Sequence, residues 1–127
     1  MKKYKLLILD DEEDLLEIII DILQDGGVAS VSEIITVING IEGKQAVSEH
    51  EFDCIVSDIN MPRMNGITFV REVQEEGFKN PIIFLSAHGD PETIKRTENL
   101  EIYKFIQKPF DGDDLCETIL EAFKVNS

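Results

Sequence analysis

Five polar side chains stand directly after short apolar runs of this sequence. Asp10 and Asp11 follow one run, Asp58 follows another, and Ser86 and Lys108 follow two later ones. Clustered carboxylates raise one another's pKa unless a cation neutralises them, and hard oxygen ligands of this kind suit Mg²⁺. Beside such a cation, an ionised carboxylate can attack phosphorus and form an acyl phosphate. An ammonium and a hydroxyl are suited to bind the oxygens of the incoming phosphoryl group.

Taken singly, most of these residues have simpler explanations. Asp11 could cap a helix, Ser86 could belong to a turn, and a lysine at the end of a strand is usually solvated. Asp58 is harder to explain in this way, because it ends an apolar run that reads as a buried strand. The chemistry therefore depends on whether the fold brings these side chains together.

Five short apolar runs predict the strands that would position them. They are rich in Ile, Val, Leu and Phe, and three of them lack polar alternation, which is typical of strands covered on both faces. The predicted strands are residues 5–9, 33–38, 53–57, 81–85 and 102–106.

Segments with helical character lie between these runs. Apolar residues three and four positions apart predict one helix before Gly26 and another that stops at Gly77. The first stripe consists of Leu15, Ile18, Ile19, Ile22 and Leu23, and the second consists of Ile67, Val70 and Val73. Residues 41–49 are predicted as a helix mainly because the alternation requires one, since Gly43 and Lys44 weaken the apolar stripe.

Two aspartates mark the starts of the remaining helices. Asp90, followed by Pro91, predicts a helix cap and a helix running to about Asn99. Asp111 predicts the cap of a last helix, whose buried side would be Leu115, Ile119, Ala122 and Phe123.

Length and charge narrow the classes of protein. The 127 residues suit a single domain, residues 1–127, and the net charge of −14 disfavours direct contact with nucleic acid or an anionic membrane surface. The two cysteines, Cys54 and Cys116, lie in patterns typical of buried thiols. No apolar stretch is long enough for a signal segment or a membrane span, so the expected location is cytoplasmic.

Strand alternating with helix five times predicts an α/β fold, with a five-stranded parallel sheet covered by helices on both faces. In such sheets the carboxyl ends of the strands meet at one edge, where ligands bind. We therefore expect Asp10, Asp11, Asp58, Ser86 and Lys108 to meet at that edge.

These motifs resemble the receiver domain of bacterial two-component response regulators over essentially the whole chain. The resemblance is carried by ILDDE, SDINMPRMNG, FLSAHG and QKPF, in this order and spacing. It implies a flavodoxin-like, doubly wound fold with strand order 2-1-3-4-5, and Mg²⁺ as the cofactor. It also implies transfer of a phosphoryl group from a sensor histidine kinase or phosphotransfer protein, and output through a downstream effector protein or a fused domain.

The resemblance also implies a role for each site residue. Asp58 would be the phosphorylated residue, and Asp11, Asp58 and the backbone carbonyl of Asn60 would bind Mg²⁺. Asp10 would reach the metal through water, and Lys108 would pair with the phosphoryl group.

Two further residues would transmit the change. Ser86 would hydrogen-bond the phosphoryl group and move toward it, and the aromatic ring of Phe105 would then turn inward. Tyr103 lies two residues too early for this role. Glu101 and Ile102 replace a Gly-Ala pair that is common in receivers, so the bend before the fifth strand is expected to differ.

Two turns are predicted in the loop after Asp58. Met61-Pro62 is expected to turn the chain so that the Asn60 carbonyl faces the metal. Asn65-Gly66 is expected to form a tight turn into the next helix, with a positive φ at the glycine.

Three other functions are alternatives for a chain with these residues. A dehalogenase-type phosphatase also uses an Asp nucleophile with Mg²⁺, but it needs a second Asp where this chain has Asn60. A receiver-like binding module without phosphorylation would be expected to lose an acid or the lysine. A flavin site would place phosphate next to the acidic residues 10–14, which would repel it.

Overall fold

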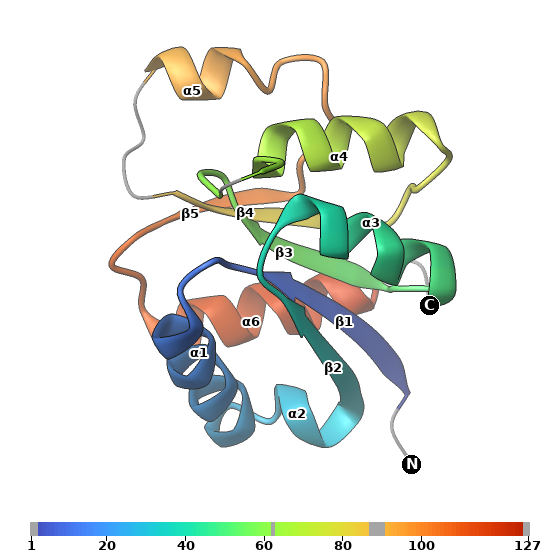
Figure 1. Ribbon diagram of the computed structural model, residues 1–127. Coiled ribbons are helices and arrows are strands. Elements are labelled where there is room, and N and C mark those ends of the chain that lie inside the picture. The colour runs from blue at the N-terminus through green and yellow to red at the C-terminus, as the bar shows by residue number, and fades with distance from the viewer. Residues whose placement is uncertain (1–2, 62, 87–90, 126–127) are drawn as a thin grey trace.

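The computed structural model describes residues 3–61, 63–86 and 91–125, and its centre is a five-stranded sheet (Figure 1). The strands are β1 (Tyr4–Leu9), β2 (Ser32–Val37), β3 (Cys54–Asp58), β4 (Ile82–Ser86) and β5 (Lys104–Gln107). All neighbouring pairs are parallel, and the strand order is β2-β1-β3-β4-β5. The predicted fold class and strand order are therefore confirmed.

Helices cover both faces of this sheet (Figure 1). They are α1 (Glu13–Asp25), α2 (Val28–Val31), α3 (Gly40–Glu49), α4 (Gly66–Glu75), α5 (Pro91–Lys95) and α6 (Gly112–Phe123). One core cluster packs α1 and α6 against the sheet, and a second cluster packs α3 and α4 against the opposite face. Strands β3 and β4 lie between the two clusters, and every residue in them is buried.

The strand boundaries differ slightly from those predicted. Asp58 and Ser86 are the last residues of β3 and β4 rather than the first residues after them. The strand that precedes Lys108 begins at Lys104, two residues later than expected. The polar residues still lie at the carboxyl edge, because the observed strand boundaries differ from the predicted ones by only one or two residues.

Three predictions about the helices were wrong in detail. Ile18 of α1 is 53% exposed, and Leu16, which the predicted stripe omitted, is buried instead. The short helix α2 was not predicted, since only four residues form it. Helix α5 ends at Lys95 rather than near Asn99.

Helix α3 has the weakest apolar stripe in the sequence, and tertiary contacts support it. A Cβ at Gly43 would lie 2.6 Å from Leu9 Cδ2 and 2.8 Å from Phe69 Cε1, so the helix approaches the core closely at this point. Lys44 contacts Glu72 of α4 and Glu76, which follows that helix, with Nζ to Oε1 distances of 2.9 and 2.6 Å. The two residues that weakened the sequence pattern are thus the ones through which α3 contacts its neighbours.

Side-chain caps fix the starts of three helices. Asn39, Asn65 and Asp111 accept hydrogen bonds from backbone N–H groups of α3, α4 and α6 respectively. The predicted Asp111 cap and the buried side of α6 are confirmed, whereas Asp90 lies outside the described residues. These caps satisfy N–H groups that a helix leaves without partners.

The segment before β5 is held to α4 by one side chain. The Gln74 amide donates to the Glu101 carbonyl over 2.8 Å, and its oxygen accepts from the Glu101 N–H over 3.2 Å. Ile102 packs against the core cluster under α4. This is the local structure that Glu101 and Ile102 adopt in place of a Gly-Ala pair.

Both cysteines, Cys54 and Cys116, are free and buried, as predicted. Among the helices that the structure describes, none is long and apolar enough to cross a membrane.

Candidate functional site

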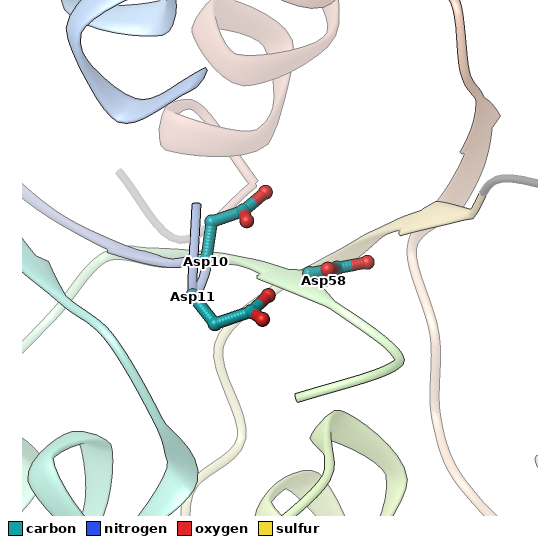
Figure 2. A group of neighbouring side chains, drawn as sticks. All are labelled: Asp10, Asp11 and Asp58. Atoms are coloured by element: carbon teal, nitrogen blue, oxygen red, sulfur yellow. The ribbon is translucent and has the colours of Figure 1, made fainter. Parts of the chain in front are cut away.

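Three carboxylates meet at the carboxyl edge of the sheet (Figure 2). Asp10 and Asp11 follow β1, and Asp58 ends β3. Strands β1 and β3 are adjacent and in register, so their ends lie side by side. One oxygen from each carboxylate lies within 4.8 Å of the others, which is close enough for all three to contact one ion. The fold thus brings together the acidic residues that the sequence predicted.

The three side chains differ in their surroundings. Asp10 is fully buried, and its Oδ1 accepts a hydrogen bond of 2.9 Å from the backbone N–H of Glu12. Asp58 is 7% exposed, and its Oδ1 accepts one of 2.9 Å from the N–H of Ile59. Asp11 is exposed. The site is therefore anchored in the protein on the Asp10 side and open to solvent at Asp11.

Burial raises the pKa of Asp58 from 3.8 to about 6. The nearby Lys108 ammonium lowers the pKa, the Asp10 carboxylate raises it, and the Ile59 N–H lowers it. Burial is the largest of these effects because removing a carboxylate from water disfavours its charged form. With a pKa of about 6, the Asp58 carboxyl gains or loses its charge at a pH not far below neutral. A cation at the site would favour its charged form.

Lys108 supplies a positive charge inside the cluster. Its Nζ lies 3.3 Å from Asp10 Oδ2 and 3.5 Å from Asp58 Oδ1. Its backbone N–H donates to the Ser86 carbonyl over 2.7 Å, which ties the end of β5 to the end of β4. The sequence prediction that Lys108 reaches this edge is confirmed.

Ser86 ends the strand next to Asp58. Asp58 is paired with Leu85 in the sheet register, and Ser86 is the following residue, nearly buried at 9% exposure. A small cavity of about 150 Å³ lies beside it, lined by Ile59, Ser86, Thr93, Ile94, Phe105, Ile106 and Gln107. Ser86 therefore lies between the acidic cluster and this cavity.

Phe105 lines the same cavity as Ser86. Its side chain is 38% exposed, and its ring lies 5.8 Å from that of Phe84 in a tilted arrangement. Tyr103, two residues earlier, is also exposed and does not line the cavity. Of the two aromatic residues, Phe105 is the one placed next to Ser86.

The loop after Asp58 corrects one prediction. Gly66 does not have a positive φ, and it is the first residue of α4, capped by Asn65. A Cβ at Gly66 would lie 2.1 Å from the backbone oxygen of Asp58. The residue must be glycine because the chain passes against the Asp58 carbonyl, not because of a left-handed turn. Among the described residues of this loop, Arg63 is the left-handed one, with a φ of 69°.

Asn60, the predicted carbonyl ligand, follows Asp58 and Ile59 and is exposed at this edge. The predicted turn at Met61-Pro62 includes Pro62, which lies outside the described residues.

The residues present fit a magnesium ion. Among the described residues, the groups that could contact an ion at this edge are carboxylate oxygens, and two of the three carboxylates are buried at close range, an arrangement that a divalent cation would neutralise. Asp10, Asp11 and Asp58 would hold it, together with the Asn60 carbonyl. Lys108 supplies only one positive charge to these three acids.

Comparisons with known proteins agree with this geometry. The model of the response regulator receiver domain matches residues 6–120. The chain is 33% identical over 116 residues to the chemotaxis protein CheY of Bacillus subtilis, covering 91% of this chain and 94% of that protein. It is 30% identical over 127 residues to the transcriptional regulatory protein GlrR of Escherichia coli, covering 97% of this chain and 27% of that protein.

A solved structure has the same architecture. The response regulator receiver domain protein of Clostridium thermocellum is 26% identical, with a TM-score of 0.83, and the match covers 97% of this chain and 96% of that one. The chain spans about a quarter of the length of the first curated relatives, such as GlrR, and nearly all of CheY. The chain therefore belongs to the response regulator receiver domain family, the signalling switches of two-component systems.

Proposed function

We propose that Asp58 accepts a phosphoryl group from a phosphohistidine of a sensor histidine kinase or phosphotransfer protein. An oxygen of the Asp58 carboxylate forms a bond to phosphorus while the P–N bond breaks, and the imidazole leaves with the electron pair. Water later attacks phosphorus, which releases inorganic phosphate and restores the carboxylate. The protein thus catalyses only its own phosphorylation and dephosphorylation.

Asp10, Asp11, Asp58 and the Asn60 carbonyl would hold Mg²⁺, with Asp10 acting through water. When bound, the ion neutralises the clustered carboxylates and the oxygens of the phosphoryl group. Asp58 needs this neutralisation because burial raises its pKa to about 6. The ionised carboxylate is the form that attacks phosphorus.

Lys108 and Ser86 would bind the transferred group. The Lys108 Nζ already lies 3.5 Å from Asp58 Oδ1, so its ammonium is close to the position that the phosphoryl oxygens would occupy. The Ser86 hydroxyl follows the residue paired with Asp58 and can donate a hydrogen bond to them. Ser86 is the last residue of β4, and Lys108 follows the last residue of β5, so both groups are attached to strand ends, which hold them more rigidly than long loops would.

The new charge on Asp58 would shift the surface around β5. When Ser86 moves toward the phosphoryl group, the cavity of about 150 Å³ beside it gains room for the Phe105 ring. Ile94 of α5, Phe105 of β5 and Tyr103, which precedes β5, are exposed, and their rearrangement would change what a downstream effector protein or fused output domain can bind. A cytoplasmic location follows from a cytoplasmic kinase partner.

One observation carries this proposal: three carboxylates and Lys108 from β1, β3 and β5 converge at one edge of the sheet. A dehalogenase-type phosphatase is disfavoured by Asn60, which cannot act as the acid and base required two residues after the nucleophile. The function of any longer protein that contains this domain depends on its other parts.

The test is to incubate the protein with Mg²⁺ and acetyl phosphate and to measure its intact mass, beside the Asp58→Asn variant. We expect the mass of one phosphoryl group on the wild type, and none on the variant or without Mg²⁺. Beryllofluoride, which mimics the phosphoryl group, should change the amide NMR shifts from Asp58 to Phe105 in the wild type only. A folded wild-type protein that gains no mass and shows no shift would exclude Asp58 as the acceptor.

A further inference from the structure

We propose that Gly40 is a positioning residue for this site. It lies at the start of α3, outside the acidic cluster, and braces the described residues between β3 and α4, which are 59–61 and 63–65 and include Asn60. The inference rests on the proposed function where it concerns Mg²⁺, but the brace itself is a property of the metal-free protein.

Gly40 contacts the loop backbone to backbone. Its N–H donates to the carbonyl of Met64 over 3.2 Å. A Cβ at Gly40 would lie 2.7 Å from Met64 Cγ, 2.8 Å from Met64 Cβ and 2.8 Å from the Met64 carbonyl oxygen. Real Cβ contacts are longer than this, and two of these three atoms cannot be moved by rotating the end of the Met64 side chain. Any side chain at position 40 would therefore displace the loop or the helix.

The loop is closed on its other side by a second backbone contact. The Gly66 N–H donates to the Ile59 carbonyl over 2.8 Å, and a Cβ at Gly66 would collide with the Asp58 backbone oxygen. Within the loop, Arg63 has a φ of 69°, which is unfavourable for a residue with a side chain. A strained backbone of this kind persists only where its surroundings hold it, and Gly40 is one of the residues that do so.

Helix α3 is better anchored than the loop. Asn39 is buried and its side chain caps the helix by accepting from the Glu42 N–H over 2.9 Å. Gly43 packs against the core, and Lys44 joins the helix to α4. When a side chain is added at position 40, the loop is therefore the part that moves, and Asn60 moves with it.

The test compares Gly40→Ala with Gly43→Ala, which makes the same chemical change in the same helix. The atoms nearest to a Cβ at Gly43 belong to the core side chains of Leu9 and Phe69. Both variants should lower the melting temperature. We expect Gly40→Ala to weaken Mg²⁺ binding about tenfold or more, as measured by NMR titration, because residues that orient metal ligands have effects of that order. Gly43→Ala should leave the Mg²⁺ affinity unchanged.

A second measurement, hydrogen exchange at the backbone amides, tests the brace in the metal-free protein. In the metal-free wild type, the Gly40 N–H should be protected from hydrogen exchange through its bond to the Met64 carbonyl. In Gly40→Ala, exchange at the amides of Asn60 and Met64 should be faster than in Gly43→Ala. Adding beryllofluoride and Mg²⁺ to the wild type should shift the Gly40 amide resonance, whereas the Gly43 amide, bonded to the Asn39 carbonyl within α3, should hardly shift.

The outcomes separate the two proposals. Equal Mg²⁺ affinities and equal loop exchange in the two variants would overturn the brace and leave the proposed function intact. A wild type that binds no Mg²⁺ would overturn the proposed function, and the exchange rates of the metal-free loop would still decide the brace. If Gly40→Ala does not fold, an unprotected Gly40 N–H in the wild type would count against the brace.

Discussion

The Nζ of Lys108 lies 3.5 Å from Oδ1 of Asp58, although the two residues come from different strands. The ammonium lowers the pKa of Asp58, but less than burial raises it, so that the pKa stands at about 6. The site thus holds a buried carboxylate whose pKa is raised although an ammonium group lies beside it.

The Asp58→Asn variant should be more stable than the wild type when Mg²⁺ is absent. Above pH 6 the wild type must keep a buried carboxylate charged, and the amide of Asn carries no charge. We expect a gain of about 1–2 kcal/mol in the free energy of unfolding at pH 7.5, after allowing for solvent screening at the open edge. Urea denaturation of both proteins measures this difference.

The same difference should depend on pH. Because burial raises the pKa of Asp58 from 3.8 to about 6, the folded protein binds its proton more tightly than the unfolded chain does. The contribution of Asp58 to the free energy of unfolding of the wild type is therefore lost as the pH rises from about 4 to about 6. The difference in free energy of unfolding between the wild type and Asp58→Asn should widen over that window and level off above it. Saturating Mg²⁺ should narrow the gap at pH 7.5. A gap that is constant from pH 4 to 7.5 would contradict the raised pKa.

Replacing Lys108 should separate metal binding from phosphoryl transfer. Lys108→Met removes the ammonium near Asp58 and should slow phosphorylation by acetyl phosphate about 100-fold, the effect typical of losing one group that stabilises transferred charge. The variant should still bind Mg²⁺, because the oxygen ligands remain. Mass spectrometry over time and an Mg²⁺ titration give the two quantities. Lys104→Met, which removes the same charge at an exposed position of β5, is the matched control.

The hydroxyl of Ser86 should couple the site to Phe105. In Ser86→Ala, Asp58 should still become phosphorylated, but the NMR signals of the Phe105 ring should respond less to beryllofluoride and Mg²⁺ than in the wild type. The physical reason is that the methyl group cannot hydrogen-bond the phosphoryl group and has no cause to move toward it. Ser86→Thr keeps the hydroxyl and should keep the response. An equal ring shift in Ser86→Ala would show that another route reaches Phe105.

Gly66→Ala should be one of the most destabilising single changes in the chain. The added Cβ would lie 2.1 Å from the Asp58 backbone oxygen, a contact that only a backbone shift can relieve. A loss of about 3 kcal/mol in the free energy of unfolding is expected. Chemical denaturation tests it, with Gly112→Ala as the milder comparison, because a Cβ there would meet only the Ile22 side chain, at 3.1 Å. A loss at Gly66 no larger than at Gly112 would contradict the close approach.

The sequence by itself determined the fold class and the membership of the site. Apolar runs without polar alternation predicted β3 and β4 as strands buried on both faces, because a side chain buried on either face must be apolar. The residues following those runs could then be assigned to one edge, since parallel strands share their carboxyl ends. Asp10, Asp11, Asp58 and Lys108 were identified in this way, and the structure brings them together.

Local sequence patterns predicted a helix less well where its residues contact elements that are distant along the chain. Gly43 and Lys44 weakened the prediction of α3, because helix propensity is a property of the segment alone. Their value lies in contacts with Leu9, Phe69 and Glu72, which belong to other elements. In the same way, Ile18 fitted the apolar stripe of α1 but lies outside the buried face, since only the packing fixes how the helix is rotated.

Only the tertiary structure decided the close contacts and the pKa values at the site. The sequence indicated glycine at position 66 for a turn, whereas the structure requires it because the chain passes against the Asp58 carbonyl. The role of Gly40 has no sequence signal, because the loop that it contacts is distant along the chain. The pKa of Asp58 likewise depends on burial and on charges from other strands. A sequence names the groups that carry the chemistry, and the folded chain sets the distances and the desolvation that give each group its properties.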